Sequence, residues 1–145
     1  MRRRALYLLQ QQDRTESNLR DKLSRSNYPE ELVEDAIAYV KSYGYIDDER
    51  YAGRFAESMS SSRSRKRVYQ DLIKRGIDRE LAASAVEENY QGDEREQIRS
   101  LLTKKNFDPE HTDRKEQQRI YAFLLRRGFS SHDILAVMKM EDTDY

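Results

Sequence analysis

The segment VYQDLIKRGIDREL, residues 68–81, has two counterparts elsewhere in the chain. They are LRDKLSRSNYPEEL, which starts at Leu19, and IYAFLLRRGFSSHDI, which starts at Ile120. Each copy opens with an apolar pair one helical turn apart, and neighbouring copies begin about 50 residues from one another. A repeat of this length is typical of a tandem array of helical units.

Each copy contains a residue of a type that accepts left-handed backbone and so ends a helix, namely Asn27, Gly76 or Gly128. A second helical pattern follows that residue, and a further candidate helix precedes each copy, at 5–11, 48–59 and 95–105. The sequence therefore predicts an all-α protein built from three tandem three-helix repeats with helix-turn-helix-like units. We place the repeats, as parts of one continuous structural unit, at residues 1–45, 46–91 and 92–145.

The composition favours an elongated array over one deep core. Hydrophobic residues make up 37% of the 145-residue chain and charged residues another 37%, which a stack of small units tolerates better. The formal net charge of +0 argues against a simple basic protein that coats DNA. Cysteine is absent, which excludes disulfide frameworks and thiolate metal sites. The apolar run from Ala5 to Leu9 is too short for a signal peptide or a membrane span, so we expect a cytoplasmic protein without membrane contact.

The acidic stretch GYIDDERYAGRF, residues 44–55, raises the question of a metal site. We interpret Asp47 as the N-cap of a helix, with Asp48 and Glu49 as first-turn carboxylates that offset the helix dipole. Ile46 and Tyr51 have the spacing of a hydrophobic staple across this helix start. Both histidines lie far along the chain, and the sequence lacks a glycine-rich phosphate loop and a histidine-centred triad. It therefore predicts no catalytic residue, no cofactor and no metal, and a protein that is not an enzyme.

Overlaying the repeats also aligns basic residues. Arg25, Lys74 and Arg126 share one position, two residues before the residue that ends the helix. Other basic positions coincide as well, so stacked units would present cations along one side, where they could follow a phosphate backbone or a carboxylate-rich groove. The candidates for contact with such a polyanion are Arg14, Arg25, Arg63, Arg65, Lys66, Arg67, Lys74, Arg75, Lys115, Arg119, Arg126 and Arg127.

Ordinary helix chemistry is an alternative explanation for part of this set. The helix dipole alone favours cations in a last turn, which is where we place Lys74, Arg75, Arg126 and Arg127. Cations at the start of a helix are unfavourable, so the stronger indication of a function comes from Arg63, Arg65, Lys66 and Arg67.

Two further groups of residues are candidate contact sites. An acidic run is a candidate protein-facing surface and consists of Glu87, Glu88, Asp93, Glu94 and Glu96. Tyr69 and Tyr121 match between repeats and could stack on bases, but both have apolar partners three and four residues on. We assign these two tyrosines to the core.

Several motifs resemble the RecX family of regulatory proteins, which bind the RecA recombinase. GYIDDERYA at 44–52 is similar to that family's Gly-Tyr-Leu-Asp-Asp-x-Arg-Phe signature, and RTESNLRDKL at 14–23 is similar to its opening motif. DLIKRGI at 71–77 and FLLRRGF at 123–129 resemble its Glu-Leu-x-x-Lys-Gly-Ile segment. The chain departs from the family in SSSRSRKR at 60–67, which keeps the basic charge but not the usual glycine.

The resemblance implies a curved, all-helical protein that lies in the helical groove of the RecA filament on DNA. There it would lower ATP hydrolysis and strand exchange and affect filament growth, in recombination, DNA repair and the SOS response. We expect the RecA filament as partner, weak binding to single- or double-stranded DNA without sequence preference, and a monomer. A helix-turn-helix DNA-binding protein is the alternative, but its groove-entering helix would carry Glu80, Glu87 and Glu88 with only Arg79 in support.

Overall fold

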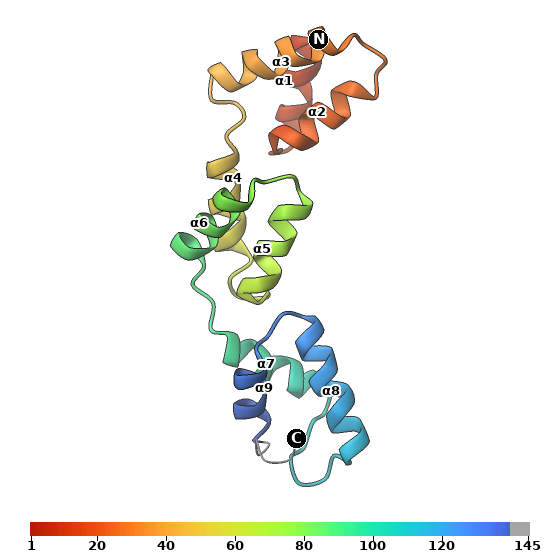
Figure 1. The fold of residues 1–145 in the computed structure, drawn as a ribbon, viewed down its shortest axis with the longest axis vertical. Coiled ribbons are helices and arrows are strands. Elements are labelled where there is room, and N and C mark those ends of the chain that lie inside the picture. The colour runs from red at the N-terminus through yellow and green to blue at the C-terminus, as the bar shows by residue number, and fades with distance from the viewer. Residues whose placement is uncertain (140–145) are drawn as a thin grey trace.

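The computed structural model describes residues 1–139, which contain nine α-helices and no strand (Figure 1). In chain order they are α1 (Arg2–Gln11), α2 (Glu16–Ser24), α3 (Glu30–Ser42), α4 (Asp48–Ser58), α5 (Arg65–Lys74), α6 (Arg79–Asn89), α7 (Glu94–Lys104), α8 (Arg114–Arg126) and α9 (Ser131–Met138). The predicted all-α class is confirmed.

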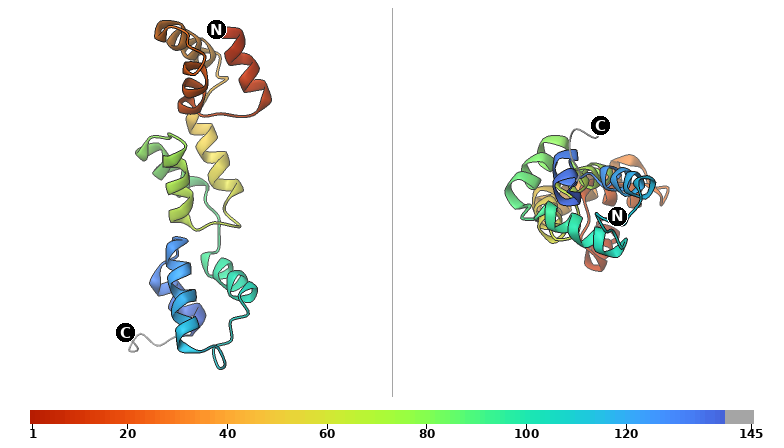
Figure 2. Two further views of the ribbon diagram at one scale, coloured as in Figure 1. Left: turned by 90° about the vertical axis from the view of Figure 1, so that its right-hand side faces the viewer. Right: turned by 90° about the horizontal axis from the view of Figure 1, so that it is seen from below.

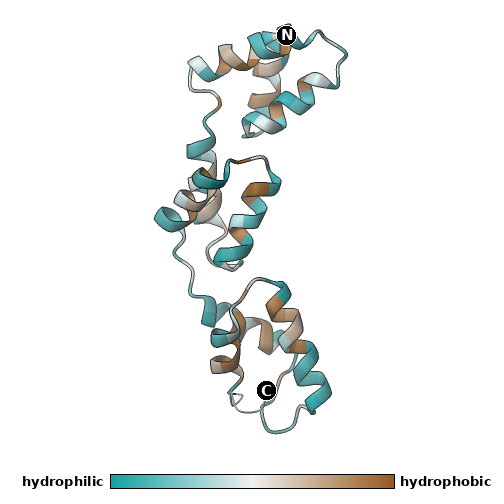
Figure 3. Cartoon of the chain, viewed as in Figure 1, coloured by the Kyte–Doolittle hydropathy of each residue, from teal (hydrophilic) through white to brown (hydrophobic). Residues whose placement is uncertain are grey.

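The helices form three successive three-helix units, arranged as an elongated and gently curved rod (Figures 1 and 2). Each unit has its own hydrophobic core, and in Figure 3 the apolar stretches of each unit turn toward its own centre. Leu19 and Leu23 lie in the first core, Leu72 in the second and Leu124 in the third. These are residues of the apolar pairs that mark the repeats in the sequence.

The helix start at Asp47 is capped as the sequence predicts, and Ser130 caps the start of α9 in the same way. The Asp47 side chain accepts a hydrogen bond from the Arg50 backbone N–H at 3.1 Å, and Ser130 accepts from the Asp133 N–H at 3.1 Å. The pair expected to form a staple is divided, because Ile46 belongs to the first core and Tyr51 packs on the second. Ile46 thus helps to fix the first unit to the segment that enters the next.

Tyr69 and Tyr121 are partly buried, and they pack against the second and third cores. Their assignment to the core is confirmed.

The three middle helices, α2, α5 and α8, follow one another end to end along one side of the rod, and we call them the column (Figure 1). The Thr15 hydroxyl at the start of α2 donates to the Arg75 carbonyl at the end of α5, at 3.0 Å. Similarly, the Ser64 hydroxyl at the start of α5 donates to the Arg127 carbonyl at the end of α8, at 2.7 Å. Each hydroxyl oxygen also caps its own helix. We call these two end-to-end contacts the joints.

The joints require glycine at two of the three helix ends. Gly76 and Gly128 have φ of 86° and 94°, and the equivalent Asn27 has φ of 60°. A Cβ on Gly76 would lie 2.3 Å from the Ser17 Cβ, and one on Gly128 would lie 2.5 Å from the Ser64 Oγ. Asn27 ends the first column helix, and none of the units described in residues 1–139 packs against that end. This position therefore needs only the left-handed backbone that asparagine tolerates.

A second hydrogen bond at each joint involves a carboxylate. The Asp48 carboxylate at the start of α4 accepts from the Glu16 N–H at 2.9 Å, and the Glu94 carboxylate at the start of α7 accepts from the Arg65 N–H. Burial raises the pKa of both carboxyl groups, and the accepted hydrogen bonds counteract this only partly. The first-turn acids therefore connect neighbouring units as well as favouring their own helices.

Replacing Gly76 by alanine should disturb the joint more than the same change at Gly44. Gly44 also has positive φ, 71°, but nothing lies within 4 Å of the position of a Cβ. Gly44→Ala should therefore cost only the left-handed backbone strain of about 1–2 kcal/mol. Gly76→Ala should cost more in urea unfolding and also alter the small-angle X-ray scattering profile. Equal losses and unchanged scattering for both variants would contradict the joint.

The Asp48 carboxyl gives a pH dependence of defined sign. Because its pKa is raised in the folded state, its contribution to stability grows as the pH falls through that raised value and is lost as the pH rises above it. Asp48→Asn keeps an oxygen acceptor and cannot titrate. Urea unfolding between neutral pH and the ordinary carboxyl range should therefore show wild type gaining on Asp48→Asn as the pH falls. A pH-independent difference would be the contrary result.

Candidate functional site

Three adjoining hollows follow the column from the first unit to the third. The first, of 460 Å³, lies where α5 meets α2, and the second, of 360 Å³, lies where α8 meets α5. The third, of 350 Å³, runs along α8. Lys74 lines the first two, while Phe123 and Arg126 line the second and third. The shared residues join the hollows into one feature, which we call the column groove.

The column groove is positively charged. Its acidic residues each form an ion pair, and three of the four partners lie outside the lining: Asp13 with Arg54 at 3.8 Å, Asp21 with Arg25 at 2.9 Å, Asp71 with Arg63 at 2.6 Å, and Glu116 with Arg119 at 3.6 Å. Twice as many lining residues are basic, namely Arg14, Arg67, Lys74, Arg75, Lys105, Arg119, Arg126 and Arg127. Even without Arg14, which is buried, cations outnumber acidic residues along the column.

The second joint carries the least compensated charge. The side chains of Arg67, Lys74 and Arg126 line its hollow and form no ion pair with any residue in 1–139. Arg127 lies over the Phe123 ring at 4.7 Å, which orients its guanidinium without neutralising it. This hollow is the part of the groove best suited to an anion.

The lining of the first joint has a smaller excess of cations than that of the second, with three basic and two acidic residues against four basic and one acidic. Arg75 donates to the Tyr51 hydroxyl and lies 4.6 Å from the centre of the Phe55 ring. Asp13 and Asp21 line the same hollow. Repeats that look alike in sequence thus differ in how strongly their joints attract anions.

The sequence prediction that Arg14 is a surface cation is wrong. The residue is only 7% exposed, and its guanidinium donates to the Leu8 carbonyl at 3.1 Å and to the Asn18 Oδ1 at 2.8 Å. Arg14 therefore ties the end of α1 to the start of α2, and we leave it out of the proposed contact surface.

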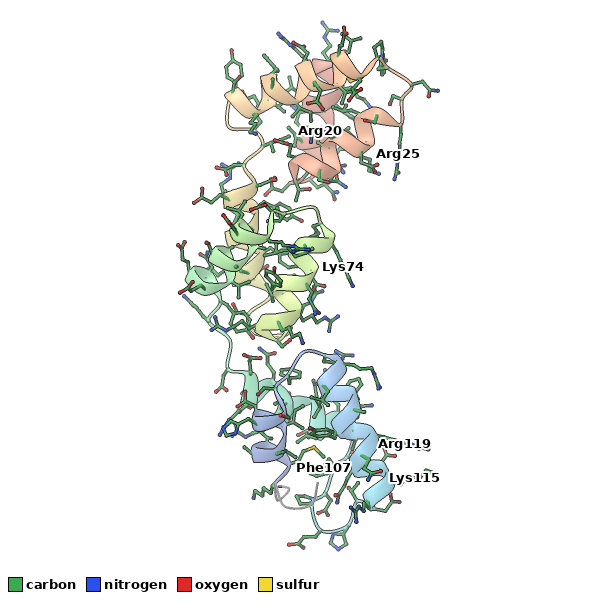
Figure 4. The ribbon with its side chains drawn as sticks, viewed as in Figure 1. Arg20, Arg25, Lys74, Phe107, Lys115 and Arg119 are labelled. Atoms are coloured by element: carbon green, nitrogen blue, oxygen red, sulfur yellow. The ribbon has the colours of Figure 1, made fainter. Side chains whose placement is uncertain are left out.

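The aligned cations of the column do lie on one side of the rod. Figure 4 shows Arg25, Lys74, Arg119 and Lys115 projecting from the same side, where the column runs. Arg25 is engaged with Asp21, whereas the Lys115 side chain has no ion pair among residues 1–139. These four of the predicted contact residues therefore lie along one side of the rod, and their role in contact stays a prediction.

The basic group at the start of α5 does not act as one cluster. Arg63 is partly buried and pairs with Asp71, and only Arg67 lines the column groove. Arg65 and Lys66 line a different hollow together with Glu94 and Asp133, and Arg65 lies over the Tyr90 ring at 4.9 Å. Three of the four residues favoured on helix-dipole grounds thus lie outside the groove.

Sequence reasoning missed Lys105, which lines the groove beside Phe123. Its ammonium lies 4.2 Å from the centre of the Phe123 ring, on the side chain that Arg127 also contacts. Lys105 has no counterpart in the aligned basic positions because it follows α7, outside the repeated segment. Its only sequence signal is a basic residue at the end of a helix.

The acidic candidates are divided between different local roles. Asp93 caps α7 by accepting from the Glu96 N–H at 3.1 Å, and Glu94 belongs to the second joint. Glu96 pairs with Arg99 at 3.1 Å, while Glu87 and Glu88 are exposed on α6 without an ion pair among residues 1–139. A single protein-facing acidic surface stays a prediction.

Within residues 1–139, no group of three or more acidic, histidine or cysteine side chains is placed to hold a metal ion. None of the helices described there is long and apolar enough to cross a membrane. The fold and the groove together define an elongated, all-α tandem-repeat protein with a cationic groove along one side.

Comparison with known proteins identifies the family. Models of the first, second and third three-helix domains of RecX match residues 2–39, 47–86 and 93–138. The chain belongs to the RecX family.

Relatives and solved structures agree with this assignment. "Regulatory protein RecX" of Caldanaerobacter subterraneus subsp. tengcongensis is 35% identical over 90% of this chain, which spans 64% of that protein. The Trichlorobacter lovleyi protein of the same name is 34% identical, over 88% of this chain and 86% of the relative. A crystal structure of regulatory protein RecX matches with a TM-score of 0.80 at 26% identity, over 97% of this chain and 71% of that one. The crystal structure of RecX from Lactobacillus salivarius shares the fold, with a TM-score of 0.73 at 24% identity. The match covers 98% of this chain and 94% of that one.

Arg14→Ala should destabilise the protein because the buried Leu8 carbonyl loses its donor. We expect a loss of about 1–3 kcal/mol in the free energy of unfolding, measured in urea. Lys115→Ala, which removes an exposed cation, is the matched control and should change stability by less than about 0.5 kcal/mol. If the two variants unfold alike, the structural role of Arg14 is wrong.

Proposed function

We propose that this chain is a non-enzymatic regulator of a recombinase and that it acts by binding along the RecA filament on DNA. The names of its relatives, "Regulatory protein RecX", support the regulatory part of this proposal. The partner follows from the family resemblance. On this proposal the protein acts as a monomer in the cytoplasm, in recombination and DNA repair.

The observation that carries the proposal is the continuous cationic groove on one side of an elongated rod. A rod of three units reaches several anionic groups of an extended partner at once, so individually weak contacts add up. Long cationic side chains that contact phosphates fix position without reading sequence. The expected binding is therefore sequence-blind and weakens steeply with salt.

Occupation of the filament's helical groove by this protein would inhibit both strand exchange and ATP hydrolysis. A rod lying in the helical groove of the filament covers surface that a second DNA strand would need, which lowers strand exchange. Bridging several filament subunits would also resist the subunit rearrangements that accompany ATP hydrolysis. Both effects require the three units to bind together, as the groove that runs across both joints allows.

A helix-turn-helix reader of duplex sequence is the less favoured function. In the second unit, the helix that would enter the major groove is α6, where Glu80, Glu87 and Glu88 are all exposed. Carboxylates facing phosphates oppose binding. Most basic residues that line the column groove lie instead on the column helices or at their ends.

Reversing the unpaired charges of the second joint should weaken regulation. Lys74→Glu with Arg126→Glu should raise the concentration needed for half-maximal inhibition of RecA ATPase by at least about tenfold at low salt. The matched control is Arg65→Glu with Lys66→Glu, the same charge change in a different hollow, which should have a clearly smaller effect. Full inhibition by the Lys74/Arg126 variant, with helicity retained, would refute the groove as the contact surface.

A further inference from the structure

Three tyrosines at the end of α3 form a row that the column groove does not use. The Tyr39 and Tyr43 rings meet edge to face with centroids 5.1 Å apart, and the Tyr43 and Tyr45 rings stack at 5.7 Å with planes only 14° apart. The Arg2 guanidinium lies over Tyr39, 4.5 Å from the ring centre. We call Tyr39, Tyr43 and Tyr45 the tyrosine row.

Folding does not explain the exposed end of this row. Tyr43 is 62% exposed and Tyr45 is 48% exposed, whereas Tyr39 packs on the first core. At the corresponding end of α6 the aromatic residue is Tyr90. Its ring is buried, and its hydroxyl group donates a hydrogen bond to the Arg63 carbonyl. The first unit thus exposes two large aromatic rings to solvent, whereas the second unit buries its counterpart. This difference indicates a ligand-binding surface on the first unit.

The backbone between the two exposed rings is open. Gly44 has φ of 71°, and no atom lies within 4 Å of the position of a Cβ there. The Arg50 guanidinium donates to the Gly44 carbonyl at 3.3 Å, which places a cation beside the stacked pair. No further ring or cation covers the outer face of Tyr45 among residues 1–139. A flat ligand can therefore stack there, with an anionic group near Arg50.

Some of the nearby carboxylates are compensated by cations. Asp35 forms a two-point hydrogen bond with Arg2, at 3.0 Å for each contact. Glu16 is paired with Lys41 at 3.0 Å and with Arg20 at 3.2 Å. Asp47 and Glu49, which follow Tyr45, form no ion pair among residues 1–139. The cations at the tyrosine row therefore offset only part of the repulsion that a phosphate would meet there.

We propose that the tyrosine row is a second nucleic-acid contact, which binds a single strand by stacking a base on the outer face of Tyr45, with Tyr43 supporting that ring from its other face. Exposed aromatic faces beside cations suit single-stranded nucleic acid, because every base has a π-face and every nucleotide carries a phosphate. A protein partner is less favoured because the exposed apolar area is narrow. Its sequence neighbours Lys41, Ser42, Asp47 and Glu49 are all exposed and polar.

The row and the column groove lie on different sides of the rod. In Figure 1 the α3–α4 connection, which carries Tyr43 and Tyr45, is at the left edge, while the column follows the right side. The row could thus hold a single strand while the groove contacts another part of the same assembly. This inference does not require the proposed function, since it concerns naked single strands.

Base stacking can be separated from phosphate binding with two labelled oligomers of about 15 nucleotides, one of thymidines and one of abasic sites. Fluorescence anisotropy should show that Tyr43→Leu with Tyr45→Leu weakens binding of the thymidine oligomer by about tenfold and leaves the abasic oligomer unaffected. Tyr43→Phe with Tyr45→Phe, which keeps the rings, should bind as wild type does. Lys74→Glu with Arg126→Glu should weaken binding of both oligomers alike.

The leucine variant decides the proposal because its substitutions are on the surface, and circular dichroism should show unchanged helicity. Wild-type affinity of the leucine variant for the thymidine oligomer would overturn it. If the leucine variant kept wild-type affinity for the thymidine oligomer but bound the RecA filament less well, the tyrosine row would be a protein contact instead. The effect of Lys74→Glu with Arg126→Glu on the inhibition of RecA ATPase tests the proposed function. It does not test the proposal for the tyrosine row.

Discussion

A hydroxyl group at the start of α2, and another at the start of α5, each form two hydrogen bonds in opposite directions. The oxygen accepts from an N–H of its own helix, at 3.0 Å in Thr15 and 3.1 Å in Ser64. The proton is donated to the last turn of a helix in the next unit, 60 and 63 residues away. A hydroxyl supplies a donor and an acceptor together, which a carboxylate cannot do. These contacts align α8, α5 and α2 and make one rod of three small cores.

The same geometry explains where the charge lies. Each column helix ends in basic residues, which the helix dipole stabilises, and each joint places this end beside the first turns of the next helix. Lys74, Arg126 and Arg127 therefore surround hollows rather than open solvent. The dipole explanation and the binding explanation for these cations are compatible, because residues favoured at a helix end by local physics are gathered into a groove by the joints.

Local patterns predicted most of the fold. The apolar pairs, the left-handed residues Asn27, Gly76 and Gly128, and the cap at Asp47 depend on neighbours in sequence, and the structure agrees with each of them. Contacts between units were not predictable in this way. Neither the Thr15–Arg75 bond nor the second role of Asp48 leaves a periodic signal, since both partners look like ordinary helix ends. The burial of Arg14 and the capture of Arg63 by Asp71 likewise depend on packing that one helix cannot reveal.

Small-angle X-ray scattering of Ser64→Asp tests the joint most directly. Aspartate can still cap α5, as Asp113 caps α8, but its carboxylate cannot donate to the Arg127 carbonyl and would repel it. We expect the Ser64→Asp protein to keep its helicity but to give a changed scattering curve, because the third unit loses its fixed orientation relative to the second. A Ser64→Asp protein that scatters as wild type does would contradict the claim that the hydroxyl joints hold the rod.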